Sequence, residues 1–116
     1  MDDHRARDLV AGERRRIEAA LRELTGELEA EGVQERQQTG DSDAASELAT
    51  EMVEGALVDD LRHELEAVQR AEERLAAGTY GRSVESGVAI PNERLEAEPL
   101  AERTVEEQRR HHAGSS

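Results

Sequence analysis

The chain of 116 residues has no cysteine, tryptophan, phenylalanine or lysine, and a single tyrosine. Without cysteine it has neither a disulfide framework nor a thiolate metal site. It has no apolar run of membrane length, and its first residues contain no apolar stretch that could serve as a signal peptide. We therefore expect a cytoplasmic protein that does not contact a membrane.

Large apolar residues are also scarce, because Leu, Ile and Val together number 21 of the 116 residues. Charged chains with so few apolar residues are either disordered or fold around a narrow core. An elongated pair of helices needs only a narrow apolar seam. This composition argues against a buried enzyme active site, and no nucleophile motif, phosphate loop or zinc-protease pair is present.

Acidic residues are what the chain has in excess, with 28 Asp and Glu against 15 Arg and a net charge of −13. Nucleic-acid binding needs a basic stripe for phosphate contacts, and here the arginines are scattered among acids. The charge therefore argues against direct nucleic-acid binding and favours a basic protein surface as the partner.

Two long helices are predicted from the heptad spacing of apolar residues. The first spans residues 5–31 and is followed by Gly32 as a plausible C-cap. A loop without periodicity follows over 33–42, and the second helix runs from Asp43 to near Gly78, about 50 Å at 1.5 Å per residue. The apolar positions are Val10, Ile17, Leu21, Leu24 and Leu28 in the first helix and Leu48, Met52, Val58, Leu61, Leu65, Val68 and Leu75 in the second.

Folding the two helices back on each other gives an antiparallel coiled-coil hairpin in which Leu21, Leu24, Leu61 and Leu65 are mutually buried. Gly26 then lies level with Gly55. Each glycine costs a helix about 1 kcal/mol relative to alanine. Their shared level indicates a close approach of the helices, a bend, or two unrelated weak points.

The chain changes character after Gly78, where glycines at 81 and 87 accompany Tyr80 and alternating Val84, Val88 and Ile90. This pattern predicts a small turn-rich or hairpin module. A short helical piece at 92–96 and a polar helix over about 101–112 complete it. The predicted domains are a hairpin over 1–77, with its tip loop near 32–43, and a module over 78–116.

A specific sequence match lies in the module, in the stretch from Leu75 to Pro99. It closely resembles the DksA/TraR family, whose pattern there is G-T-Y-G-x-C-x-x-C-G-x-x-I-x-x-x-R-L-E-A-x-P. The two predicted helices resemble that family's coiled coil, so the resemblance covers roughly residues 9–110. The matching residues are Gly78, Thr79, Tyr80, Gly81, Gly87, Ile90, Arg94, Leu95, Glu96, Ala97 and Pro99.

The resemblance implies a mainly α-helical protein: a long antiparallel coiled-coil hairpin, a small zinc-finger-like module and a C-terminal helix. It also implies a bacterial regulator that inserts its coiled coil into the secondary channel of RNA polymerase. Such a regulator modulates initiation without binding DNA and is not an enzyme. Its partner would be core polymerase, contacted at the channel rim and in the active-site region, and we expect a monomer.

Zinc is the main departure from the family pattern. Where the family has two C-x-x-C pairs, this chain has Ser83 and Ser86, then Thr104 and Glu107. Hydroxyl groups, whose pKa lies far above 7, do not hold Zn²⁺. We therefore expect a degenerate, metal-free module without a cofactor, held by apolar contacts. The expected apolar residues are Tyr80, Val84, Val88, Ile90, Leu95, Leu100 and Val105.

Guanosine tetraphosphate binding is a second departure. Some family members bind this ligand through basic residues, and three of those positions align with Ala67, Glu98 and Gln108. A phosphate clamp needs cations. We expect no binding at that site.

The tip loop carries the family's remaining feature, acids between the long helices followed by an alanine. Asp43 and Ala45 match this pattern, and Asp41 matches it less well because its spacing to Asp43 is one residue shorter. By resemblance, Asp43 acts near the polymerase active site. Helix N-capping is the alternative role for this carboxylate, and the two roles are compatible.

Other candidate groups are explained without a function. Glu107 and His111 have an i, i+4 spacing, but two ligands are too few for a metal. We expect the arginine runs 14–16 and 109–110 to pair with nearby acids, such as Glu18. A contact of Arg109 or Arg110 with polymerase is the alternative, which their spacing does not support. Asp59 and Asp60 point apart on a helix and share no proton. A structural or interaction protein that dimerises or binds another basic protein stays the alternative function, and transcript-cleavage assistance is a weaker third.

Overall fold

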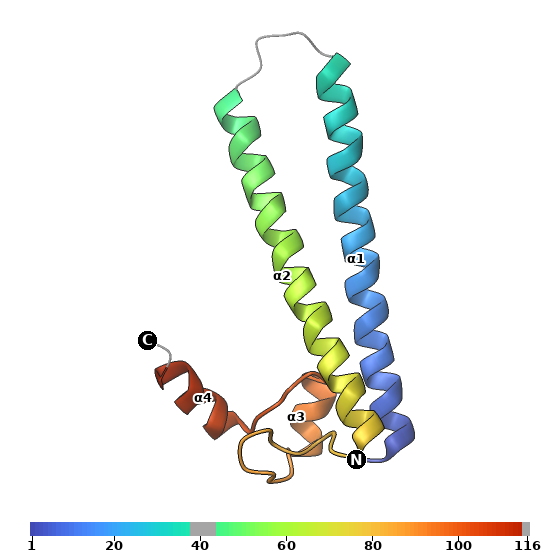
Figure 1. The fold of residues 1–116 in the computed structure, drawn as a ribbon, viewed down its shortest axis with the longest axis vertical. Coiled ribbons are helices and arrows are strands. Elements are labelled where there is room, and N and C mark those ends of the chain that lie inside the picture. The colour runs from blue at the N-terminus through green and yellow to red at the C-terminus, as the bar shows by residue number, and fades with distance from the viewer. Residues whose placement is uncertain (38–43, 115–116) are drawn as a thin grey trace. The chain divides into compact units, whose positions relative to one another are not determined.

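Four helices make up the regular structure in the computed structural model, which describes the backbone of residues 1–37 and 44–114 and the side chains of residues 1–26 and 52–113. They are α1 (Asp3–Gln37), α2 (Ala44–Ala77), α3 (Asn92–Ala97) and α4 (Val105–Gly114) (Figure 1). Within the described residues there is no strand, only one isolated antiparallel bridge between Arg82 and Ala89. The protein is therefore mainly α-helical.

The first helix is longer than predicted. Gly32 does not end it, because α1 continues to Gln37. The residues after Gly32 include Gln34, Glu35 and Arg36, which have good helix propensity. Extending a helix that already exists is easier than starting one, so one interior glycine does not stop it.

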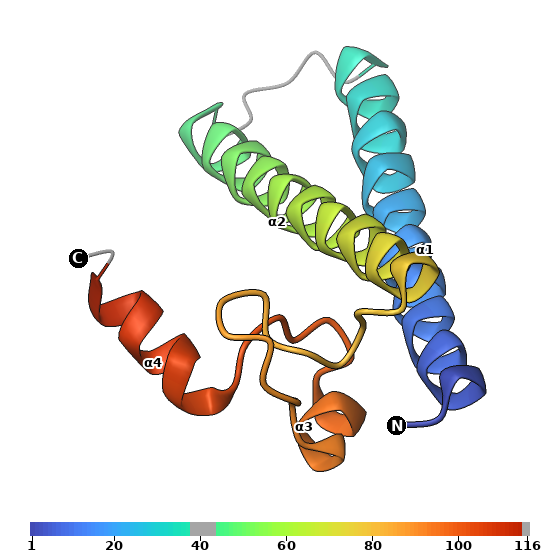
Figure 2. The same ribbon diagram turned by 60° about the horizontal axis from the view of Figure 1, so that its bottom comes forward.

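The chain forms two compact units, Arg14–Glu66 and Met1–Glu13 together with Ala67–Ser116. The predicted division into residues 1–77 and 78–116 cuts the chain at a single point, and it stays a prediction. In the first unit, α1 and α2 run antiparallel and side by side (Figures 1 and 2). An ion pair joins Arg16 of α1 to Glu64 of α2 at 3.8 Å.

Burial in the Arg14–Glu66 unit is narrower than expected. Ile17 and Val58 are buried, but full burial was wrong for Leu21, Leu24, Leu61 and Leu65, each of which is half-buried. Two helices cover only one side of each other, so residues beside the central line of contact stay partly in water. The arginine interpretation is confirmed at Arg14, which pairs with Glu18 at 2.7 Å.

The two helical glycines of this unit do not mark a close approach. A Cβ atom added at Gly26 or Gly55 would meet nothing within 4 Å. Both positions are therefore free to take alanine. The interpretation as a close approach was therefore wrong, and two separate weak points are compatible with the open space at both glycines.

We predict that Gly26→Ala and Gly55→Ala each stabilise the protein by about 0.5–1 kcal/mol, because alanine loses less backbone entropy in a helix. Thermal unfolding followed by circular dichroism at 222 nm measures the effect. Gly78→Ala is the matched control, and it should destabilise because Gly78 has φ +76°. Lower melting temperatures for the first two variants would contradict this prediction.

The second unit contains the start of α1, the end of α2, the segment 78–104, α3 and α4. Its buried apolar residues come from α1, α2, the segment after α2 and α3. They are Ala6, Val10, Val68, Ala71, Ile90 and Leu95, and Pro99 after α3 is buried with them. The unit thus has a small core of its own.

A C-terminal cap on α2 turns the chain into this segment. The Gly78 N–H bonds to the Leu75 carbonyl at 3.3 Å, and the Thr79 N–H bonds to the Arg74 carbonyl at 2.9 Å. With Gly78 at φ +76°, this is a Schellman motif, which explains why α2 ends at Ala77. The segment then runs beside residues 98–104 (Figure 2), where the Val84 N–H donates to the Glu102 carbonyl at 2.9 Å.

None of the helices in the described part of the chain is long and apolar enough to span a membrane.

Candidate functional site

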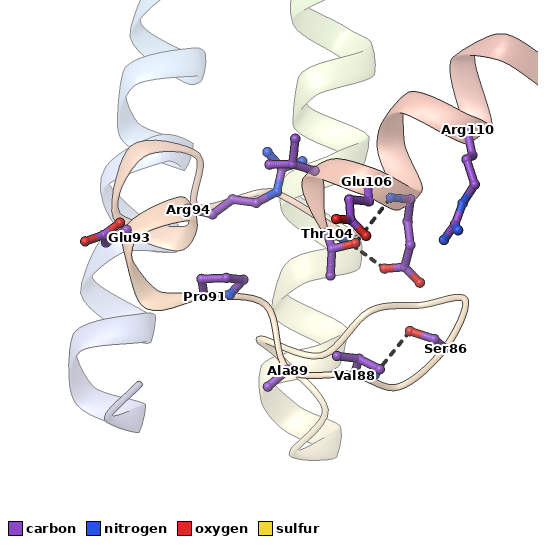
Figure 3. A pocket seen from close by; sticks show the side chains of 11 residues that line it. Ser86, Val88, Ala89, Pro91, Glu93, Arg94, Thr104, Glu106 and Arg110 are labelled. Carbon is purple, nitrogen blue, oxygen red and sulfur yellow. Dashed lines mark hydrogen bonds between the residues drawn. The ribbon is translucent and has the colours of Figure 1, made fainter.

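Ser83 and Ser86 lie in a tight turn within the segment after α2. The Ser83 hydroxyl oxygen accepts the backbone N–H groups of Glu85 at 3.1 Å and Ser86 at 3.2 Å. The Ser83 carbonyl accepts the Gly87 N–H at 2.9 Å, and Gly87 takes φ +76° to close the turn. Ser86 repeats the pattern by accepting the Val88 N–H at 3.3 Å (Figure 3). The hydroxyl oxygens therefore organise the backbone of the turn.

Thr104 and Glu107 form a reciprocal pair at the start of α4 (Figure 3). The Glu107 carboxylate accepts the Thr104 N–H at 3.0 Å, and the Thr104 hydroxyl oxygen accepts the Glu107 N–H at 3.2 Å. This is a capping box, in which an N-cap residue and the residue three positions later satisfy each other's N–H groups. It explains why α4 begins at Val105 rather than near the predicted Ala101.

The two pairs come together around the Glu107 carboxylate. Ser83 and Glu107 are each only 5% exposed, and they are the buried polar residues among the described side chains. The Thr104 N–H, followed by the hydroxyls of Ser86 and Ser83, lowers the pKa of Glu107 from its ordinary 4.5 to about 2. A carboxylate that accepts several hydrogen bonds is stabilised in its ionised form. The cluster Ser83, Ser86, Thr104 and Glu107 therefore joins the turn to α4 through one buried negative charge.

This cluster does not suit a zinc ion. It offers three hydroxyls and one carboxylate, whereas Zn²⁺ takes thiolate, imidazole or carboxylate ligands. The Glu107 carboxylate is already occupied by N–H and hydroxyl donors. Within the described residues, no group of three or more His, Cys, Asp or Glu could hold a metal.

We predict that the purified protein contains no stoichiometric zinc and that a chelator such as EDTA leaves its helicity unchanged. Elemental analysis and circular dichroism check the two statements. About one zinc per chain, with helicity lost on chelation, would contradict them.

Fewer apolar residues are buried in this module than expected. Val84, Val88 and Val105 are 48%, 58% and 43% exposed, so their expected burial was wrong. Ile90 and Leu95 are buried as predicted. The remaining two, Tyr80 and Leu100, are half-buried.

Hydrogen bonds and ion pairs connect the segments of this module. Burial raises the pKa of the Tyr80 phenol, whose hydroxyl donates to the Pro99 carbonyl at 2.8 Å. Glu102 receives Arg70 at 3.0 Å and Arg74 at 3.1 Å. Burial alone would raise the pKa of Glu102, but the hydrogen bond from Arg70 and the positive charges of the arginines outweigh it and lower the pKa. Arg5 binds Glu96 through two hydrogen bonds, of 3.0 and 2.5 Å, which links α1 to α3.

The positions aligned with a guanosine tetraphosphate site carry no cation. Glu98 pairs with Arg94 at 3.3 Å, and the Gln108 amide lies 3.0 Å from the His112 ring. Ala67 has no polar side chain. Glu107 and His111 also do not form a metal pair, because Glu107 is buried in the cluster and His111 is exposed.

The predicted tip residues are Asp41, Asp43 and Ala45. Asp41 and Asp43 lie outside the described residues. Ala45 lies in the first turn of α2, which begins at Ala44, but its side chain is not among those described. Their role stays a prediction from the sequence.

The capping box was not predicted, although its signal can be read in the sequence. Thr104-Val-Glu-Glu107 has the S/T-x-x-E spacing that marks a helix start. The hydroxyl contacts of Ser83 had no such signal, since they depend on a partner 24 positions along the chain.

Comparison with known proteins identifies the class of this fold as DksA-like. The solved structure of transcription factor DksA2 from Pseudomonas aeruginosa superposes with a TM-score of 0.82. The match covers 97% of this chain and 84% of that chain at 26% sequence identity.

The sequence comparison points to a second protein, General stress protein 16O of Bacillus subtilis (strain 168). It is 35% identical over 99 residues, which is 85% of this chain. The match spans 57% of the length of that protein. No protein-family model matches the chain.

Proposed function

We propose that this protein is a zinc-free regulator of the DksA/TraR family that binds RNA polymerase and modulates transcription initiation without binding DNA. In this proposal α1 and α2 form a coiled-coil hairpin that enters the secondary channel, and residues 78–116 form a degenerate zinc-finger-like module that docks at the rim. The protein acts in the cytoplasm as a monomer and is not an enzyme.

The fold carries this proposal, because a TM-score of 0.82 over 97% of the chain relates it to a protein described as a transcription factor. The sequence supports it independently through the match between Gly78 and Pro99. The charge supports the absence of DNA contact, since the 15 arginines are scattered along the sequence among 28 acids.

The tip supplies the mechanism in this proposal. A carboxylate at the end of a helical pair can reach a catalytic Mg²⁺, or the basic residues around it, through a channel too narrow for a globular domain. Asp43, followed by Ala45, is the candidate, and Asp41 is the second acid of the loop.

Binding to purified core RNA polymerase tests the proposal, with in vitro initiation as the functional measurement. The proposal expects saturable binding and a change in the yield of initiated transcripts when the protein is added. If neither effect is observed, the alternative is supported: a structural or interaction protein that dimerises or binds another basic protein. Sedimentation equilibrium then distinguishes these two, because a dimerising protein changes mass with concentration.

A further inference from the structure

A groove of about 640 Å³ opens between the segment 86–91, α3 and the first turns of α4 (Figure 3). Val88, Ala89, Pro91 and Val105 form its apolar lining. Val88 is 58% exposed and Val105 is 43% exposed. This chain has few apolar residues, so two exposed valines in one groove are notable. Exposing their apolar surface to water is unfavourable, and such a patch is typical of an interaction site.

A free cation lies at the same groove. Arg110 lines it, and Figure 3 shows its side chain extending from α4 toward the turn that carries Ser86. In the described part of this unit, Arg109 and Arg110 are the arginines without a hydrogen bond or ion pair to the protein, so the expected pairing with nearby acids was wrong for this run. The other arginines of the unit all have an acceptor or an acid, namely Arg5, Arg7, Arg70, Arg74, Arg82, Arg94 and Arg103.

The acids around the groove leave Arg110 available. Glu107 is committed to the cluster, where it accepts the Thr104 N–H and the serine hydroxyls. The side chain of Glu93 extends away from the apolar lining (Figure 3). Glu106 is the one other acid of the lining that can face a bound partner. The change in affinity when Glu106 loses its charge therefore reports the sign of the partner's charge.

We propose that this groove is a protein docking site that takes an aliphatic side chain next to a carboxylate, and that the segment it takes belongs to RNA polymerase. The aliphatic side chain covers Val88 and Val105, and the carboxylate pairs with Arg110. This inference rests on the proposed function, because RNA polymerase is the partner that the proposed function names. It adds a contact that is separate from the tip loop.

A nucleic acid is the poorer fit for this groove. One free guanidinium beside Glu106 does not form the cationic track that a phosphate backbone needs. An apolar contact flanked by one charge pair is instead the usual composition of a protein interface, where a few anchors dominate the affinity.

Titration of core RNA polymerase with paired variants tests the inference. Val88→Asp and Arg110→Ala should each raise the Kd by about tenfold, because each removes one anchor. The controls match them in exposure and position: Val84, 48% exposed and outside this groove, is changed to Asp, and Arg109, next to Arg110 on α4, is changed to Ala. The controls should stay within about twofold of the parent. Circular dichroism verifies that all four variants keep the parent's helicity.

Two further measurements fix the chemistry of the partner. Added salt should narrow the difference between Arg110→Ala and the parent, since screening weakens a charge pair. Glu106→Gln should tighten binding, because it removes a negative charge beside an acidic partner; weaker binding would overturn the acidic assignment.

The failures are distinguishable. If the parent protein does not bind polymerase at all, the proposed function and this inference fall together. If the parent binds and the groove variants bind as tightly as their controls, the groove inference alone is overturned.

Discussion

Glu107→Gln should loosen the module that follows α2, lowering its melting temperature by about 5 °C or more. The amide keeps the size of the carboxylate but loses its charge, and its NH₂ group cannot accept a hydrogen bond. The serine hydroxyls and the Thr104 N–H then share one neutral oxygen, and charge-assisted hydrogen bonds become ordinary ones. Tyr80, the single aromatic residue, lies in this module, so its fluorescence follows the transition.

Glu106→Gln is the matched control for this variant. Glu106 is the preceding residue of the same helix turn, but it is exposed. Its replacement should leave the Tyr80 transition within about 1 °C of the parent, as is usual for exposed substitutions. Equal effects of the two variants would show that the cluster does not stabilise the module.

The effect of Glu107 should depend on pH in a defined direction. Its pKa is lowered from 4.5 in the unfolded chain to about 2 in the folded protein. The stability that it contributes is therefore fully present above about pH 4.5 and is lost as the pH falls toward 2. Glu96 and Glu102 also have lowered pKa values, so the parent alone does not isolate Glu107. The difference in melting temperature between the parent and Glu107→Gln isolates the contribution of Glu107. This difference should shrink as the pH falls from about 4.5 toward 2, and a constant difference would contradict the lowered pKa of Glu107.

Asp43→Asn should abolish most of the effect on transcription, reducing it by about tenfold, while leaving binding to polymerase intact. Asparagine caps a helix about as well as aspartate, so the start of α2 at Ala44 should be kept. The substitution removes one negative charge, and in a channel interior of low dielectric one charge counts for more than at a surface. In vitro initiation and the Kd for core polymerase are the two measurements.

Asp59→Asn provides the control for the tip. Asp59 is an exposed acid on α2, and its replacement removes the same charge from the same chain. It should leave both the Kd and the transcriptional effect unchanged. If Asp43→Asn regulates like the parent, Asp43 is only a helix cap, and the helices act by filling the channel.

The long helices could be predicted from the sequence because their signals are local. The second helix was expected from Asp43 to near Gly78 and is observed over Ala44–Ala77. Gly78 ends it by adopting a positive φ, and glycine can do so without support from tertiary contacts. Gly32 shows the limit of this reasoning, since a glycine without a competing capping structure does not stop α1.

The contents of the candidate site could be predicted only in part. The resemblance to the DksA/TraR pattern indicated that Ser83, Ser86, Thr104 and Glu107 occupy the four positions of the former metal ligands. It did not indicate that a carboxylate would be buried among hydroxyls, because burial of Glu107 depends on α4 meeting the turn. The apolar interpretation failed at Val84, Val88 and Val105 for the same reason: a valine has the pattern of a core residue in any segment, and only packing decides whether anything covers it.

By itself, then, the sequence determined the mainly helical class, the ends of α2, the unsuitability of the cluster for zinc and the unfavourable charge for nucleic acid. These follow from backbone preference, ligand chemistry and net charge, which are properties of residues and their near neighbours. Only the tertiary structure decided that Glu107 would be 5% exposed, that Val88 and Val105 would line an open groove and that Arg110 would lack an acid within the described residues. Those outcomes arise from contacts between segments far apart in the chain, and no local pattern encodes which of two similar residues such a contact will cover.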